Sequence, residues 1–295
     1  MAASIPALAD SLALQVLQRD WLSANHIVFA GGEAPATVVD TGYARHAELT
    51  IALLAHALGG QALQRIVNTH LHSDHCGGNH ALQARWSGLQ TLVPAASFGA
   101  VAQWDEAVLS YRATGQHCER FQVDGMLQPG EMLALGAARW QVLAAGGHDP
   151  DAVMLFEPQT RTLISGDALW EDRLAIIFPE IEGEPGFGPA RETLARIEAL
   201  RPRWVIPGHG AAFEDAGAAL AASRRRLDAF ERDPARHLRH AARALVMFHM
   251  MEVQQHGRAA LQAWLQATPI FQRMAARSAG PAGIPAWAAD LVAGL

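Results

Sequence analysis

The sequence predicts a layered fold of the α/β or α+β class with a helical extension at its C-terminal end. Short apolar runs of strand length recur through the first 215 residues, and helical patterns lie between them. Because the order of strands and helices is mixed, layered sheets are the expected architecture. The strand signals end near residue 216, so we expect one domain over residues 1–215 and a helical extension over residues 216–295.

Four of the apolar runs end at a residue that can bind a metal ion. They cover residues 65–70, 140–148, 162–167 and 204–209, and their last residues are His70, His148, Asp167 and His209. A glycine precedes the last residue in three of the four runs and permits a tight turn just after the strand. Loops at strand ends, held by a rigid sheet, are where functional sites usually lie.

Other segments of the first domain indicate a hairpin and two helices. Residues 25–41 read as paired strands around a Gly-Gly-Glu-Ala-Pro turn. Helical spacing of apolar residues extends over 45–58, up to a Gly-Gly pair, and over 190–200, between two prolines. Residues 168–189 are rich in Gly and Pro, so we expect no helix there.

The extension is expected to be a series of helices, at about 216–231, 234–256, 258–267 and 270–277, followed by a Gly/Pro-rich end. Its first part is basic, with Arg224, Arg225, Arg226, Arg232, Arg236, Arg239 and Arg243. Such a run is usually a solvated helix face, and contact with an anionic substrate such as RNA is the functional alternative. Met247, Phe248, Met250 and Met251 form an apolar cluster that can pack on its own domain or on a second subunit, and we expect a homodimer.

Composition excludes several classes of protein. Half of the 295 residues are hydrophobic and 18% are charged, as in an ordinary globular protein. The net charge of −6 argues against a general nucleic-acid binder, and no apolar run is long enough for a membrane helix. We find no secretory signal, so we expect a cytoplasmic protein in which Cys76 and Cys118 are reduced thiols.

All 23 basic residues other than histidine are arginines, and the chain has no lysine. Nucleotide bias in the source genome explains this most simply, but it has a chemical consequence. No lysine can act as nucleophile, Schiff base or substrate anchor. An anionic part of a substrate must therefore meet arginine, backbone N–H groups or metal ions.

The segment Thr-His-Leu-His-Ser-Asp-His at residues 69–75 carries the strongest chemical signal. His70 and His72 are two residues apart, so an extended backbone places both imidazoles on one side. Asp74 and His75 follow where the chain turns into a helix, and they can face a second point nearby. Histidine and carboxylate ligands without thiolate suit zinc, iron or manganese. One segment does not complete two metal sites, and His148, Asp167 and His209 are the candidates for the remaining ligands.

Together these motifs resemble those of the metallo-β-lactamase superfamily. The resemblance covers about residues 20–215 and extends to Val-Asp-Thr-Gly at 39–42. It implies an α+β fold, a four-layer αββα sandwich with the site at one edge, and a catalytic domain over residues 1–215 with a core like that of glyoxalase II. It also implies that His70, His72 and His148 bind one metal ion and that Asp74, His75 and His209 bind another, with Asp167 bridging both and Asp40 supporting the site from behind.

The resemblance and the implied ligand roles together predict a dinuclear hydrolase that acts on a small-molecule substrate. We expect two divalent ions, zinc first, with iron or manganese as alternatives. Zinc lowers the pKa of bound water to about 7, and the metal-bound hydroxide would attack the carbonyl of an ester, thioester, lactone or amide. Asp74 is the expected catalytic residue, because it can orient the nucleophile or pass a proton to the leaving group.

Departures from the family pattern leave the substrate open. Glyoxalase II relatives often carry a Tyr-bearing motif after the last histidine and bind glutathione with Lys and Arg, whereas Gly-Ala-Ala-Phe213 stands here. The alternatives are a mononuclear iron persulfide dioxygenase, which the complete second ligand set disfavours, a metal-dependent ribonuclease, and a binding protein without turnover. Trp170 and Phe178 are candidates for the pocket wall, and residues 97–118 for a covering element.

Overall fold

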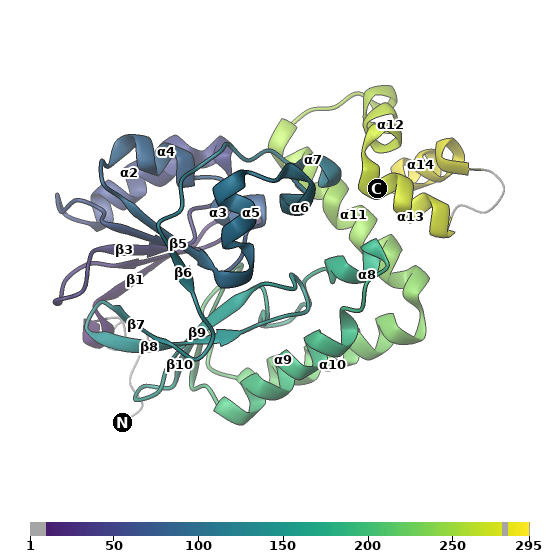
Figure 1. Cartoon of the computed structure of the whole chain (residues 1–295). Helices are drawn as coiled ribbons and strands as arrows, with labels where there is room; N and C mark the ends of the chain where they lie inside the picture. Colours follow the sequence, from purple (N-terminus) through teal and green to yellow (C-terminus); the bar gives the residue numbers. More distant parts are fainter. Residues whose placement is uncertain (1–9, 279–282, 295) are drawn as a thin grey trace.

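The computed structural model describes residues 10–278 and 283–294, and its strands form two sheets (Figure 1). The first sheet has the order β1-β2-β3-β4-β5-β6, with bounds Leu14–Leu17, His26–Phe29, Thr37–Val39, Arg65–Val67, Gln90–Pro94 and Gly125–Leu127. The second has the order β11-β10-β9-β8-β7, with bounds Trp204–Pro207, Thr162–Gly166, Val153–Glu157, Ala138–Ala144 and Met132–Leu135. The expected hairpin over 25–41 is confirmed, since β2 and β3 pair antiparallel.

Helices cover the outer face of each sheet, which confirms the four-layer αββα sandwich. Helices α2 (Ala47–Ala57) and α4 (Asn79–Arg85) lie on the first sheet, and α9 (Phe187–Leu200) and α10 (Ala216–Arg232) lie on the second (Figure 1). Apolar side chains fill each interface: Val38, Leu54 and Leu82 under α2 and α4, Val39, Trp140 and Ile164 between the sheets, and Phe156, Leu194 and Leu220 under α9 and α10. Burial of these side chains is the main force that holds the layers together.

Shorter elements and the rest of the extension complete the fold. They are η1 (Ala44–His46), α3 (Ser73–Cys76), η2 (Ala95–Ser97), α5 (Phe98–Gln103), α6 (Glu106–Leu109), α7 (Tyr111–Thr114), α8 (Phe178–Glu182), α11 (Pro234–Val253), α12 (Arg258–Ala267), α13 (Pro269–Ser278) and α14 (Gly283–Ala293). In the described ranges, none of the helices is both long enough and apolar enough to cross a membrane.

Three helical expectations need correction. Residues 168–189 do contain a helix, α8, because Pro179 occupies a first-turn position, where its missing N–H costs nothing, and Gly183 ends the helix in the left-handed region. Helix α14 stands where a Gly/Pro-rich end was expected. Helix α11 ends at Val253 rather than near 256, because Gln254 adopts a φ of 67°.

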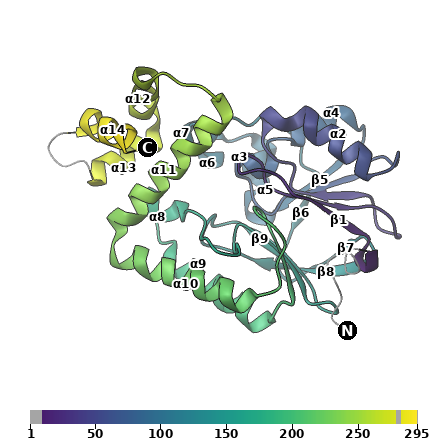
Figure 2. The ribbon, with the colours of Figure 1, turned by 180° about the vertical axis from the view of Figure 1, so that it is seen from behind.

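The extension packs in two different ways. Helix α10 contributes Ala219, Leu220 and Leu227 to the same core as the second sheet, so it belongs structurally to the outer layer. Helices α11 to α14 share a separate core with Ile181 of α8, and they lie to one side of the sandwich in both views (Figures 1 and 2). The division of the chain at residue 215 remains a prediction.

Candidate metal centre

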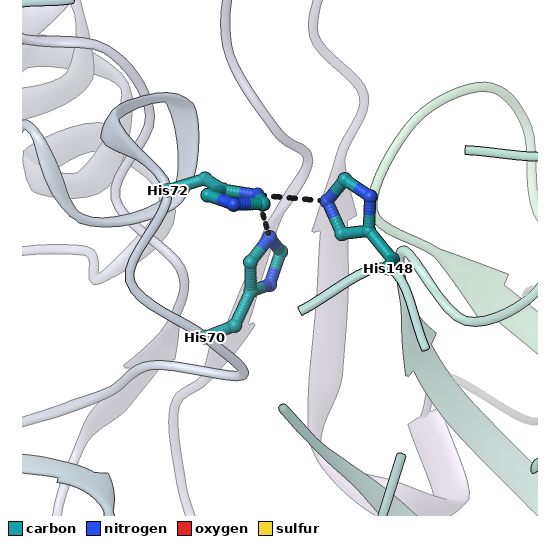
Figure 3. Close-up of side chains that lie close together, drawn as sticks. All are labelled: His70, His72 and His148. Atoms are coloured by element: carbon teal, nitrogen blue, oxygen red, sulfur yellow. Dashed lines mark hydrogen bonds between the residues drawn. The ribbon is translucent and has the colours of Figure 1, made fainter. Parts of the chain in front are cut away.

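Three histidines from two strand ends form the first group of donors. His70 and His72 follow β4, and His148 follows β8. The Nδ1 atom of His72 lies 3.0 Å from Nε2 of His70 and 2.7 Å from Nε2 of His148, as Figure 3 shows. One nitrogen of each ring therefore points to a common centre, as in a site with three imidazole ligands.

Two carboxylates and two histidines form a second group beside the first. Asp74 and His75 lie in α3, Asp167 follows β10, and His209 follows β11. The Nε2 atom of His209 is 3.1 Å from Oδ2 of Asp74, and Nε2 of His75 is 3.3 Å from Oδ1 of Asp167. The structure thus brings all seven predicted site residues together in two groups; that they bind metal remains a prediction.

Asp167 stands between the two groups. Its Oδ1 faces His75, and its Oδ2 lies 3.5 Å from Nε2 of His148 and 3.9 Å from Nε2 of His209. One carboxylate thus contacts histidines of both groups. This position is the one expected of a ligand shared by two ions.

A buried aspartate holds the second group from behind. Asp40 accepts hydrogen bonds from the Thr69 backbone N–H at 2.9 Å, from Thr69 Oγ1 at 2.8 Å and from Nδ1 of His75 at 2.7 Å. Its bond to Nδ1 leaves Nε2 of His75 free to face the centre. A carboxylate behind a ligating histidine fixes the tautomer and orients the ring, so the structure gives Asp40 the supporting position expected of it.

His148 is oriented by the backbone of a different region. Its Nδ1–H donates to the carbonyl of Ile176 at 2.5 Å. The next backbone N–H, of Ile177, donates to Nε2 of His237 in α11 at 3.2 Å. A short chain of hydrogen bonds therefore connects the helical extension to the first donor group.

Space for the second group depends on a glycine just before His209. A Cβ atom on Gly208 would lie 2.2 Å from Oδ1 of Asp167 and 2.8 Å from Cε1 of His75. Both distances are shorter than any real contact, so a side chain at this position would displace both donors. The glycine in the Pro-Gly-His run thus makes room for the site.

Burial and charge set the protonation of the two groups differently. Burial, reinforced by neighbouring histidines, keeps the pKa of His70 well below its ordinary value and lowers the pKa of His72 to about 3. Burial also acts to lower the pKa of His75, but the carboxylates of Asp167, Asp40 and Asp74 outweigh it and raise that pKa well above its ordinary value. The first group is thus neutral, and the second has an excess of negative charge.

The donor set fits divalent metal ions. Neutral imidazoles with inward-facing nitrogens are ready ligands, and buried carboxylates require a compensating cation. The Nε2 atom of His75 is buried, and it has no hydrogen-bond partner among the residues that the structure describes. A cation at the centre would satisfy this nitrogen and neutralise Asp74 and Asp167, displacing the proton that the carboxylates hold on His75.

A cavity of about 390 Å³ opens onto the donors. Its size lies within the range of about 300–1,000 Å³ that is usual for small-molecule sites. It is lined by Trp21, His72, Asp74, Gln116, His148, Asp167, Trp170, Arg173, Leu174, Ile176, Phe178, His209, Arg226, His240, Ala244, Leu245, Met247, Phe248 and Met251. Both candidates for the pocket wall, Trp170 and Phe178, are among these residues.

Several lining residues were not singled out from the sequence as pocket residues. Trp21 stacks on His209, with ring centroids 5.3 Å apart, and helix α11 supplies a complete wall. From the segment 97–118, Gln116 lines the cavity, whereas Tyr111 contacts the Sγ atom of Cys76 at 3.2 Å. Neither Trp21 nor α11 has a local motif, because only tertiary packing brings them to the metal centre.

Comparison with known proteins agrees with this geometry. A model of the metallo-beta-lactamase superfamily matches residues 19–209, which is well over half of the chain. The chain belongs to the metallo-β-lactamase superfamily. The solved structure of a metallo-beta-lactamase family protein from Thermus thermophilus has a TM-score of 0.60 and 20% identity, and the match covers 77% of this chain and 81% of that one. At this identity, the match supports the fold alone.

Curated relatives include hydrolases of thioesters. A hydroxyacylglutathione hydrolase of Synechococcus sp. (strain JA-3-3Ab) is 31% identical over 190 residues, which cover 64% of this chain and 63% of the relative. The acyl-coenzyme A thioesterase MBLAC2 of Homo sapiens is 24% identical over 153 residues, covering 48% of this chain and 54% of the relative. The chain therefore spans less than two thirds of the length of either relative.

Proposed function

We propose that the protein is a dinuclear metal-dependent hydrolase that cleaves an ester, thioester, lactone or amide of a small-molecule substrate. The observation that carries this proposal is the pair of adjacent donor groups, joined by Asp167 and facing one cavity. The first ion would be held by His70, His72 and His148. The second would be held by Asp74, His75 and His209, with Asp167 shared between the two ions.

Divalent ions, zinc before iron or manganese, would supply acidified water and an electrophile for the carbonyl oxygen. The chain's own groups position the reaction. Asp74 lines the cavity beside His209, so it can orient the attacking water and carry its proton to the leaving group. Trp170 and Phe178 exclude bulk water from the scissile bond.

Thioesters are the first substrate class to test. The relatives named hydroxyacylglutathione hydrolase and acyl-coenzyme A thioesterase both act on this class by name. The cavity, with mostly apolar lining residues beside the donor groups, is compatible with an acyl group.

Two alternatives receive less support. A mononuclear iron dioxygenase needs only one donor group, whereas four buried or nearly buried donors form the second group here. A ribonuclease would use the arginines of α10 and α11 for phosphate contacts. Two of these arginines already pair with neighbouring carboxylates, Arg224 with Glu198 and Arg239 with Asp233. Nucleic acid is therefore a secondary candidate partner, and the homodimer remains a prediction that size-exclusion chromatography with light scattering can check.

The test combines metal analysis with a substrate panel. Protein prepared without chelator should contain about two divalent ions per chain, and it should hydrolyse members of a panel of esters, thioesters, lactones and amides. Chelation should abolish turnover, and zinc should restore it. A single iron ion together with oxygen consumption on glutathione persulfide would replace this proposal with the dioxygenase, and cleavage of only a phosphodiester would replace it with the nuclease.

A further inference from the structure

The cavity has two chemically different walls beyond the metal centre. One wall is apolar and comes from α11, with Leu245, Met247, Phe248 and Met251. Phe248 is held in place by an edge-on contact with Tyr43, at a centroid distance of 5.3 Å. The apolar side chains of this wall can pack against a hydrocarbon chain.

The other wall carries two guanidinium groups, those of Arg173 and Arg226. Both side chains are exposed, and Arg226 donates a hydrogen bond to the backbone carbonyl of Asp172 at 3.1 Å. Within the described ranges, the ion pairs of these two arginines amount to one contact of 3.7 Å, between Arg173 Nε and Asp172 Oδ1. Most of their donors thus remain available to a ligand.

An aromatic residue positions this cationic wall close to the second donor group. The guanidinium of Arg173 lies 4.7 Å from the ring centroid of Trp21. The same ring stacks on His209 at 5.3 Å with an interplanar angle of 9°, and Trp170 contacts both rings edge-on. A single indole thus separates the cation from a donor of the metal centre, so one small substrate can reach both.

The electrostatic environment of a neighbouring histidine agrees with a cationic wall. His240 also lines the cavity, and burial together with the charges of Arg226 and Arg173 lowers its pKa. The two arginines form a local cationic group on a chain whose overall net charge is −6. An anionic ligand would be attracted to this part of the molecule in particular.

We propose that Arg173 and Arg226 bind an anionic group of the substrate, while its acyl chain packs against α11. The substrate class is then a thioester or ester of an aliphatic acid that carries a carboxylate or a phosphate on its leaving group. This inference rests on the proposed hydrolase function and adds substrate recognition to it. Guanidinium groups suit both anions, because they form bidentate, charge-assisted hydrogen bonds with either.

The test uses three hexanoyl thioesters with the same acyl group. One carrier is neutral, N-acetylcysteamine; one bears a carboxylate, 3-mercaptopropionate; and one bears a phosphate, 4′-phosphopantetheine. Wild-type zinc-loaded enzyme should prefer the anionic carriers. The variants are Arg226→Gln, Arg173→Gln and the double variant, with Arg224→Gln as matched control, since Arg224 lies on the same helix but pairs with Glu198.

Each single substitution should lower kcat/KM for the anionic thioesters about tenfold, and the double variant about 30- to 100-fold. The same variants should change kcat/KM for the neutral thioester less than about threefold, and Arg224→Gln should change nothing. The preferred anionic carrier identifies the anion as carboxylate or phosphate. Equal losses on all three carriers, or no loss on any, would overturn the proposal.

A binding measurement separates this inference from the hydrolase function. The thioether analogues of the anionic carriers are not hydrolysed, and their Kd can be followed by calorimetry. An Arg-dependent Kd without turnover of any member of the ester, thioester, lactone and amide panel would support the anion site and contradict the hydrolase. Turnover of thioesters with an Arg-independent Kd would support the hydrolase and overturn the anion site.

Packing of the acyl chain on the apolar wall of α11 can be tested separately, from the dependence of kcat/KM on acyl-chain length. Met247 is 53% exposed, so Met247→Ser should leave the fold intact. It should reduce the gain in kcat/KM between acetyl and hexanoyl thioesters about threefold, because less apolar surface is buried. An unchanged gain in both Met247→Ser and Phe248→Ser would contradict packing of the acyl chain on α11.

Discussion

The two donor groups lie side by side, yet different parts of the molecule hold them. The first group consists of neutral imidazoles, and its His148 is oriented through Ile176 and Ile177 by α11 of the extension. The second group carries two carboxylates, and its His75 is held by Asp40 inside the sandwich. The sandwich alone therefore organises the second donor group, whereas the first group also depends on the helices packed beside the sandwich.

Asp167 contacts both donor groups, so its substitution should have the largest effect of any single change. We expect Asp167→Asn to lower kcat/KM by at least about a thousandfold, since metal activation contributes several kcal/mol to the barrier. Elemental analysis should show loss from both sites. His72→Ala is the matched control, and it should deplete the first site while the second retains its ion; equal depletion in both variants would contradict the bridging position.

Asp40→Asn should weaken the second site selectively. An amide offers one acceptor oxygen, whereas Asp40 accepts from the Thr69 backbone N–H with Oδ1 and from Thr69 Oγ1 and His75 Nδ1 with Oδ2. Loss of such a supporting carboxylate typically costs 10- to 100-fold in metal affinity. Competitive chelator titration should show this loss in one of the two binding steps only; an equal loss in both steps would contradict selective support of the second site by Asp40.

His237→Leu should weaken the first site by a smaller amount, about three- to tenfold, because His237 acts through the 176–177 backbone rather than on a ligand. His237→Gln retains an acceptor for the Ile177 N–H and should restore most of the affinity. The titration used for Asp40→Asn provides the measurement. Failure of glutamine to rescue would indicate that His237 contributes packing alone.

The same histidine gives a pH dependence to folding stability. Burial lowers the pKa of His237 from 6.5 to about 4. The unfolded chain therefore binds a proton that the native protein excludes, so stability is complete above about pH 6.5 and falls as the pH drops towards 4, by on the order of 3 kcal/mol from this group. Urea denaturation of the metal-free protein should show a shallower decline for His237→Gln, and parallel pH profiles would contradict the assignment.

Residue patterns alone predicted layered sheets and singled out the seven candidate donors, because each donor ends a short apolar strand or opens the turn after one; the four-layer sandwich followed from the family resemblance. His148, Asp167 and His209 are recognisable in this way although they lie far from residues 70–75 in the chain. The cavity walls were harder to predict. Arg173, Arg226 and Trp21 come from separate segments without a shared motif, and Phe178 was expected in a loop because the proline of α8 was taken as a helix breaker.

Helix α11 contacts both halves of the sandwich, since Phe248 packs on Tyr43 after β3 and His237 accepts a hydrogen bond from the segment before α8. Helix α11 therefore connects the segments that follow strands of the two sheets, and it also lines the cavity. Substitutions at its cavity-lining residues Leu245, Met247 and Met251, away from His237, can change which substrates are accepted while the ion-binding loops stay as they are. Catalytic chemistry and selectivity can thus diverge separately in proteins built on this plan.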